Sequence, residues 1–294
     1  MEPSTKIGPD EAAMPSHGYL LCCIERTGSN LVTRALTGTG IAGRPIEYFN
    51  PVMQDKPRLR GILGDSNMVE GLGKIVSAGT TANGWFGAKI HWGHFRYLGM
   101  SILGEWKDSQ RTAAYEMLQS RFPKVLTPSA ACELLRPRFG DLSAQKTAYS
   151  LLQSRVPDLR VIWLRRHNMV ARAISLFRAL RTGLWHQRLS QSTTAAVERM
   201  EDFDFEAIHC LYCLGFFQEE CWQRFFQEQK LSPYSVVYEE LVADYESTMR
   251  GILRFLQLDG EQMSIPPLTS RKQSDALSEQ WERRYRKSIA EGGI

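Results

Sequence analysis

The stretch that decides the fold covers residues 18–38 and reads GYLLCCIERTGSNLVTRALTG. Residues 18–24 are continuously apolar, which is typical of a short buried strand. Residues 25–30 are polar, and the apolar positions after them recur at helical spacing until Gly38 or Gly40, either of which suits a helix C-terminus. The pattern predicts strand, loop and helix, an arrangement that directs backbone N–H groups and the positive end of the helix dipole at an anion.

The loop carries side chains that suit a phosphate or sulfate group. Arg26 supplies a fixed positive charge, and Thr27, Ser29 and Asn30 supply hydrogen-bond donors. Gly28 allows close backbone approach. The loop lacks the Lys and the spacing of a Walker motif. Taken alone, the pattern is equally compatible with an ordinary turn between strand and helix.

A second unit of the same kind begins at Leu159. The buried strand LRVIWL is followed by a turn at residues 165–168 and an amphipathic helix from Met169. Strands that alternate with helices indicate an α/β domain with a parallel sheet, in which ligands bind beyond the C-terminal ends of the strands. Arg166 and Ser175 would then join the first loop around one nucleotide, unless the arginines of this unit only line a solvated helix face.

The rest of the chain alternates similarly. We expect a strand over residues 85–92 and a strand followed by a turn in SVVYEELV, and a polar tail from Pro266. We expect helices over residues 108–136, 144–156, 203–229 and 247–258.

Composition narrows the class of protein. The 294 residues include 36 Lys+Arg and 32 Asp+Glu, a net charge of +4, too small to suggest a nucleic-acid partner. No apolar run approaches the length of about 20 residues needed to span a membrane. Residues 1–16 have no apolar segment of a secretory signal, and we expect them to form a flexible tail before a single domain over residues 17–294. The absence of a membrane anchor leads us to expect a cytoplasmic location. The six cysteines lie mostly in apolar segments and are expected to be core residues.

The segment after the first helix makes a resemblance recognisable. Residues 26–30 and the following Thr39-Gly40-Ile41-Ala42-Gly43-Arg44-Pro45-Ile46-Glu47-Tyr48-Phe49 resemble the bacterial sulfotransferases typified by trehalose 2-sulfotransferase. The likeness continues in residues 83–89, in residues 173–179 and in the C-terminal segment from Gln273 to Tyr285. The resemblance implies a P-loop-NTPase-like three-layer α/β sandwich with a central parallel sheet.

The resemblance also implies a reaction and its residues. The donor would be 3′-phosphoadenosine-5′-phosphosulfate (PAPS), with residues 26–30 around its 5′-phosphosulfate and Arg166 and Ser175 on its 3′-phosphate. Lys272 would close over the nucleotide. Glu47, in the Pro-x-Glu motif, would be the general base, for which a raised pKa would help. A sulfuryl group carries less charge than a phosphoryl group, so we expect the reaction to require no metal.

Two positions depart from the family pattern. Glu25 stands beside the anion loop, where a carboxylate would repel the ligand unless it points away, pairs with Arg34 or itself acts as a base. Asn30 replaces the common Thr and can still donate a hydrogen bond to phosphate.

The acceptor would be a hydroxyl compound, with a carbohydrate or another polar metabolite expected. Lys89, on a possible central strand, is a candidate to contact the sulfonate. Further candidates for acceptor binding are Arg44, His91, Trp92, His94 and Trp185. His91 is also an alternative base, Trp92 equally suits the core, and Arg44 could instead pair with Glu47.

Other readings of the sequence remain open. A small-molecule kinase is disfavoured by the missing loop Lys, and a catalytically inactive nucleotide-binding scaffold is disfavoured by the combined presence of the candidate residues. A homodimer is compatible with the sequence.

Overall fold

The computed structural model describes residues 15–54, 56–107, 112–121, 127–185, 200–259, 264–267 and 275–292. The predicted flexible tail falls mostly outside them, as does Lys272. Pro15 is buried, and the carbonyl of Ser16 accepts a hydrogen bond of 3.3 Å from the backbone N–H of Asp158. The chain is thus packed on the domain from Pro15, two residues before the predicted boundary.

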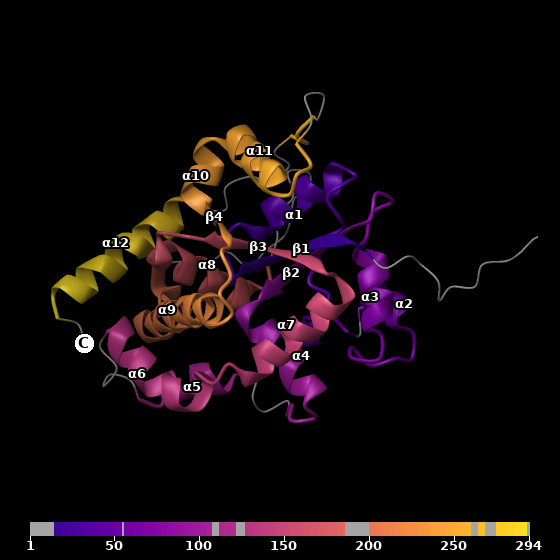
Figure 1. The fold of residues 1–294 in the computed structure, drawn as a ribbon. Helices are drawn as coiled ribbons and strands as arrows, with labels where there is room; N and C mark the ends of the chain where they lie inside the picture. The colour runs from indigo at the N-terminus through magenta and orange to yellow at the C-terminus, as the bar shows by residue number, and fades with distance from the viewer. Residues whose placement is uncertain are drawn as a thin grey trace, which may run out of the picture.

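A parallel sheet lies at the centre of the molecule (Figure 1). Its strands occur in the order β2-β1-β3-β4, and all neighbours are parallel. The strands are β1 (His17–Cys23), β2 (Trp85–His91), β3 (Asp158–Arg165) and β4 (Tyr234–Val237). All four coincide with predicted strands. β1 and β2 are almost wholly buried apolar runs, β3 is mostly buried, and the short outer strand β4 buries only Val236.

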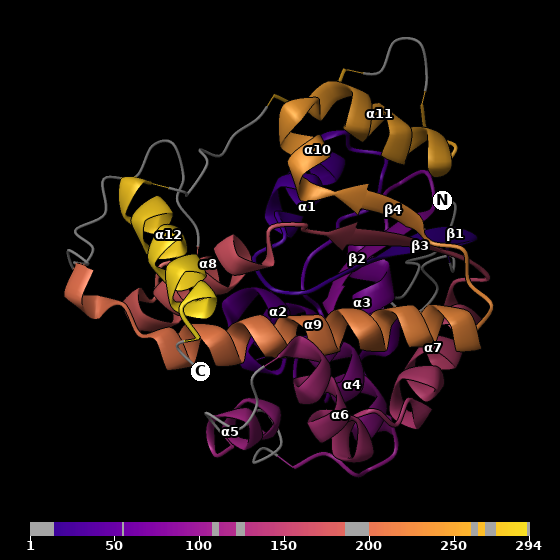
Figure 2. The ribbon, with the colours of Figure 1, turned by 90° about the vertical axis from the view of Figure 1, so that its left-hand side faces the viewer.

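Helices cover both faces of the sheet (Figures 1 and 2). The first face carries α1 (Ser29–Gly38), α10 (Tyr238–Ala243) and α11 (Tyr245–Phe255); the second carries α4 (Trp92–Ile102), α7 (Ser143–Arg155) and α9 (Phe205–Glu228). Side chains alternate along β1, so that Leu21 packs with the first set and Leu20 with the second. The predicted three-layer α/β sandwich with a central parallel sheet is confirmed.

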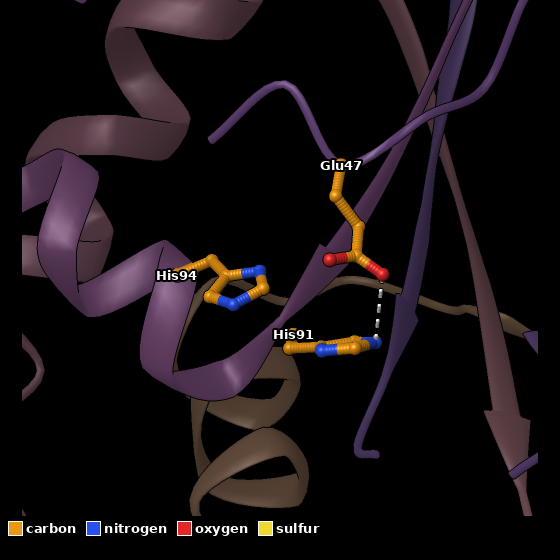
Figure 3. A group of neighbouring side chains, drawn as sticks. All are labelled: Glu47, His91 and His94. Carbon is orange, nitrogen blue, oxygen red and sulfur yellow. Dashed lines mark ion pairs between the residues drawn. The ribbon is translucent and has the colours of Figure 1, made fainter. Parts of the chain in front are cut away.

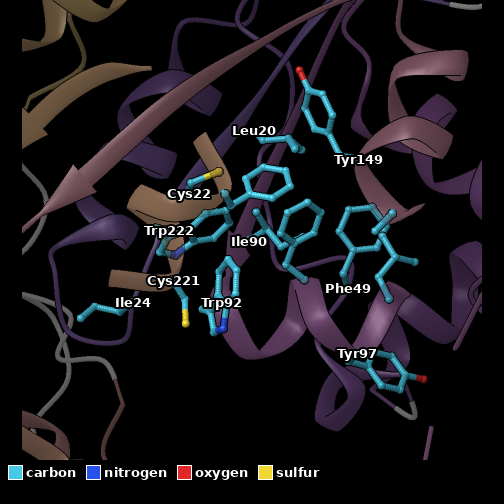
Figure 4. Packing of buried hydrophobic residues seen from close by; sticks show 14 of the residues in the cluster. Leu20, Cys22, Ile24, Phe49, Ile90, Trp92, Tyr97, Tyr149, Cys221 and Trp222 are labelled. Carbon is cyan, nitrogen blue, oxygen red and sulfur yellow. The ribbon is translucent and has the colours of Figure 1, made fainter. Parts of the chain in front are cut away.

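The larger core lies between the sheet and α9 and is rich in aromatic rings (Figure 4). Trp222 stacks on Phe95 at 5.5 Å between ring centroids and meets Trp92 edge-on at 4.9 Å. All six cysteines are buried and free, as predicted. Cys22 and Cys221 belong to this cluster and pack there as small apolar side chains.

The C-terminal segment differs from the prediction of a polar tail. It forms α12 (Ala276–Ala290), which packs on α8 (Met169–Thr182) and α9. Trp281 and Tyr285 are buried in that contact, and Arg178 pairs with Asp275 at 2.7 Å. The sequence signal was weak because an otherwise charged helix buries just these two aromatic positions, spaced i and i+4.

The remaining elements are short. The predicted helix over residues 108–136 is divided in the described residues into α5 (Ala113–Gln119) and α6 (Pro128–Phe139). The others are η1 (Pro51–Met53), α2 (Pro57–Leu63), α3 (Leu72–Gly79) and η3 (Met200–Asp202). Among the described residues, no helix has both the length and the apolar character needed to cross a membrane.

Candidate active site

The loop between β1 and α1 has a backbone suited to an anion. Arg26 has a φ of 68° and Gly28 a φ of 86°, both in the left-handed region. A Cβ on Gly28 would lie 2.4 Å from the ring of Tyr238, so the position requires glycine on two grounds. No side chain caps the helix at Gly28, and the first turn of α1 contains no acidic residue. The N-terminus of α1 thus keeps its favourable potential for a bound anion.

The side chain of Arg26 is held in place by hydrogen bonds to the second strand-helix unit and to the residues that follow it. Its Nε donates to Ser175 Oγ at 2.9 Å, and its Nη1 donates to the carbonyl of Trp185 at 2.7 Å. Burial and the neighbouring charge of Arg166 lower the pKa of Arg26 to about 10. The structure therefore brings together Arg26, Arg166, Ser175 and Trp185, which the sequence separates by up to 159 residues.

Arg166 is positioned to receive a negative ligand. Its Nη1 donates to the carbonyl of Arg26 at 3.1 Å, and its guanidinium lies 4.7 Å from the ring centroid of Tyr238. Its Nε is buried and makes no hydrogen bond within the described residues, and Glu239 Oε1 is 4.0 Å from that nitrogen. Burial lowers the pKa of Arg166. Two adjacent, desolvated guanidinium groups repel each other until an anion compensates their charge.

Glu47 lies at the C-terminal end of β2, next to this anion site. Its Oε1 is 2.6 Å from Lys89 Nζ, and its Oε2 accepts a hydrogen bond of 2.7 Å from Asn50 Nδ2. Lys89 also donates to Asn30 Oδ1 at 2.6 Å. A single buried ammonium group therefore joins the proposed base to the first turn of α1.

The charge around Glu47 overturns the expectation of a raised pKa. Burial alone would raise the pKa of Glu47, but His91, Lys89 and His94 together lower it well below its ordinary range. Glu47 is thus ionised throughout the neutral range, which a base needs. It is also a weak base while the surrounding positive charge is uncompensated.

His91 lies between the carboxylates of Glu25 and Glu47. Figure 3 shows its ring beside Glu47 and His94. Its Nδ1 is 3.6 Å from Glu25 Oε1 and its Nε2 is 3.9 Å from Glu47 Oε1, while its ring stacks on His94 at 4.8 Å. Burial lowers the pKa of His91, but Cys23, Glu47 and Glu25 outweigh burial and raise it to about 9. A protonated imidazole cannot accept a proton, so the alternative reading of His91 as the base is not favoured. Glu25 faces His91 and not Arg34.

The raised pKa of His91 predicts a pH-dependent stability. The charged form is favoured in the folded state, so its stabilisation is complete below about pH 6.5 and is lost as pH rises towards 9. Between pH 6 and pH 8, the free energy of unfolding should fall by roughly 2 kcal/mol from this group. Urea unfolding at both pH values, with chelator present, should show a smaller decrease in His91→Gln than in the wild type; equal decreases would contradict the assignment.

For three residues, the structure differs from a predicted role, position or contact. Trp92 is only 4% exposed and packs against Trp222 and Phe95, so its prediction as an acceptor-binding ring is wrong. β2 is an outer strand of the sheet, so the placement of Lys89 on a central strand is also wrong, although its side chain is 4% exposed. Arg44 donates to the carbonyl of Thr80 at 2.8 Å and makes no ion pair with Glu47 within the described part of the chain.

Several site residues were missed from the sequence. Tyr238 packs against Gly28 and Arg166, and Glu239 accepts hydrogen bonds from the backbone N–H groups of residues 167 and 168. Both follow β4 directly, so the rule that ligands bind beyond the C-terminal ends of parallel strands could have found them. Asn50 gave no comparable signal.

Comparison with known proteins identifies the family to which the chain belongs. The sequence model of the Stf0 sulphotransferase family matches residues 18–103 and 130–288. Trehalose 2-sulfotransferase of Mycolicibacterium smegmatis is 25% identical over 298 residues, which cover 94% of this chain and 97% of that protein. Its counterpart from Mycobacterium tuberculosis is 23% identical with the same coverage. The sulfotransferase domain of the Synechococcus PCC 7002 olefin synthase aligns over 98% of both chains with a TM-score of 0.39 and 14% identity. The family match spans most of the chain, which therefore belongs to the Stf0 sulphotransferases and is an enzyme of the transferase class.

Proposed function

We propose that this enzyme transfers a sulfuryl group from PAPS to an acceptor hydroxyl, with Glu47 as the general base. One observation carries the proposal. Lys89 Nζ is 2.6 Å from both Glu47 Oε1 and Asn30 Oδ1, so a carboxylate and an anion-binding helix N-terminus share one buried cation. Sulfuryl transfer needs a base next to an anion site, because the hydroxyl oxygen attacks in line with the leaving phosphate.

The residues of the two strand-helix units fit a nucleotide with two separate anionic groups. The α1 N-terminus and Arg26 suit the phosphosulfate, while Arg166 has a buried Nε available for the 3′-phosphate. Ser175 is engaged by Arg26 and lies at the same edge. Each group has the charge or the donors that an anionic nucleotide requires.

In the proposed reaction, Glu47 takes the proton of the acceptor hydroxyl as its oxygen bonds to sulfur. The bond between sulfur and the bridging oxygen of the 5′-phosphate breaks, and that oxygen keeps the electron pair. Arg26 and Lys89 stabilise the negative charge that develops there. Donor binding also adds negative charge beside Lys89 and His91, which raises the pKa of Glu47 and makes it a stronger base when it is needed.

The acceptor is proposed to be a carbohydrate or a similarly polar hydroxyl compound. Both curated relatives are named as trehalose 2-sulfotransferases, and trehalose is a sugar. At 23–25% identity the acceptor can differ, since one fold serves many substrates. Trehalose is therefore the first compound to test.

Calorimetric titration with adenosine 3′,5′-bisphosphate tests the nucleotide site. The wild type should bind, and Arg166→Ala should weaken binding by about 1.5–3 kcal/mol, or roughly 10- to 150-fold, as expected for a charge-assisted contact. Arg136→Ala removes an exposed arginine that pairs with Glu220 on α6 and α9, and it should bind like the wild type. Absence of binding to the wild type, or equal binding by Arg166→Ala, would refute the nucleotide assignment.

A further inference from the structure

The side chains around the proposed base also have the composition of a transition-metal site. Glu47, His91 and His94 each offer a ligand atom, and these atoms lie within 4.8 Å of one another (Figure 3). Imidazole nitrogen with a carboxylate oxygen is a donor set that favours Zn²⁺, Co²⁺ or Ni²⁺ over Mg²⁺ or Ca²⁺. We propose that these three residues bind Zn²⁺ and that the bound ion inhibits the enzyme.

His91 provides evidence independent of the clustering. Its side chain is 9% exposed, and its Nε2 is buried without a hydrogen-bond partner among the described residues. Nε2 points at Glu47 Oε1, while Nδ1 faces Glu25. A histidine that binds a metal almost always directs its other ring nitrogen at a carboxylate or carbonyl, and this is the arrangement of His91.

Glu47 is supported in the same way. Asn50 Nδ2 donates to Oε2 at 2.7 Å, which fixes the carboxylate with Oε1 towards the histidines. Glu47 thus already has the kind of outer partner that orients a metal-binding side chain. Glu25, the departure from the family pattern, lies 3.6 Å from His91 Nδ1, where a small shift would give His91 the corresponding hydrogen bond.

Only a small contraction is needed to close the site. Ligand atoms around a tetrahedral Zn²⁺ lie roughly 3.4 Å apart, given bonds of about 2.0–2.1 Å. His91 Nε2 and Glu47 Oε1 are 3.9 Å apart in the structure. His94 lies in the first turn of α4 and is partly exposed, so its ring can adjust. Three protein ligands would leave one position of the ion for water.

The local charge permits a dication. Glu25 and Glu47 contribute two negative charges beside the positive charge of Lys89, and Glu25 also interacts electrostatically with the buried Arg172. A bound metal would take the place of a proton on His91. The ion would bind the oxygen of Glu47 that takes the proton, so Glu47 could no longer act as the base. This consequence for activity rests on the proposed function, whereas binding of the ion rests on the three ligands alone.

Cobalt spectroscopy tests binding without any enzyme assay. Tag-free, chelator-treated protein titrated with Co²⁺ should show a saturable visible absorption at one equivalent, which Zn²⁺ abolishes by displacement. His94→Ala should weaken Co²⁺ binding at least about 10-fold, and Glu25→Gln should weaken it roughly 10- to 100-fold, as found for outer partners of metal ligands. His17→Ala, which removes a histidine paired with Asp158 at the other end of β1, should bind Co²⁺ normally.

The outcomes separate this proposal from the proposed function. No saturable band in the wild type, or equal Co²⁺ affinity in the wild type and His94→Ala, would overturn the metal site. If transfer activity is found, Zn²⁺ should inhibit the wild type more strongly than His94→Ala, each relative to its own metal-free rate. Cobalt binding without any transferase activity would retain the metal site and refute the proposed function instead.

Discussion

Glu47→Gln is expected to lower kcat by about 10²–10⁴-fold, the usual contribution of a positioned general base. Glutamine keeps the shape of the side chain and its hydrogen bonding to Lys89, but it cannot accept the acceptor's proton. Release of adenosine 3′,5′-bisphosphate in the presence of trehalose, followed by other sugars, measures the effect. Because Glu47 lies beside the nucleotide site but is not part of it, the variant should bind adenosine 3′,5′-bisphosphate about as tightly as the wild type.

The matched control is Asp158→Asn. It also removes one carboxylate from an ion pair, with Arg160, and from a hydrogen bond with His17, but at the opposite end of β1. It should leave kcat within about 2-fold of the wild type, because it does not touch the reacting groups. A wild-type rate in Glu47→Gln would exclude Glu47 as the base. Nucleotide binding by the wild type without turnover of any acceptor would favour the inactive scaffold instead.

The sequence was sufficient to predict the sheet and the anion loop, and the reason is physical. Buried parallel strands are short apolar runs, and the polar residues directly after them must lie at one edge of the sheet. For this reason Arg26, Arg166 and Ser175 could be grouped before their contacts were known, and the structure brings them together.

The electrostatics of the site could not be predicted in this way. Glu47 was expected to have a raised pKa because burial raises it, but the opposing effect comes from Lys89 and His91 on a different element. The partner that Glu25 contacts depends on the register between β1 and β2, which sets Cys23 opposite His91. Contacts between segments that are distant in the sequence determine the pKa of Glu47 and the partner of Glu25. A local sequence pattern carries no information about such contacts.

The packing beneath the site gives the largest expected effect on stability. Gly99 lies on α4 where this helix crosses the start of α7. A Cβ at Gly99 would lie 1.9 Å from the carbonyl oxygen of Ala144, which is backbone and cannot rotate away. Gly99→Ala must therefore separate the two helices, and it should reduce the free energy of unfolding by about 3 kcal/mol, the upper end of the usual cost of overpacking.

Gly93→Ala is the control within the same helix. A Cβ at Gly93 meets nothing within 4 Å, so the variant should change stability by no more than about 1 kcal/mol, with stabilisation expected from the higher helix propensity of alanine. Urea unfolding of both variants measures the difference, and equal midpoints would show that α4 and α7 are less closely packed than the structure indicates.

Because α4 continues directly from β2 through His91, displacement of this helix should also disturb the contacts of His91 and Lys89 with Glu47. Any folded Gly99→Ala protein should then lose transferase activity, although Gly99 touches neither the base nor the nucleotide site.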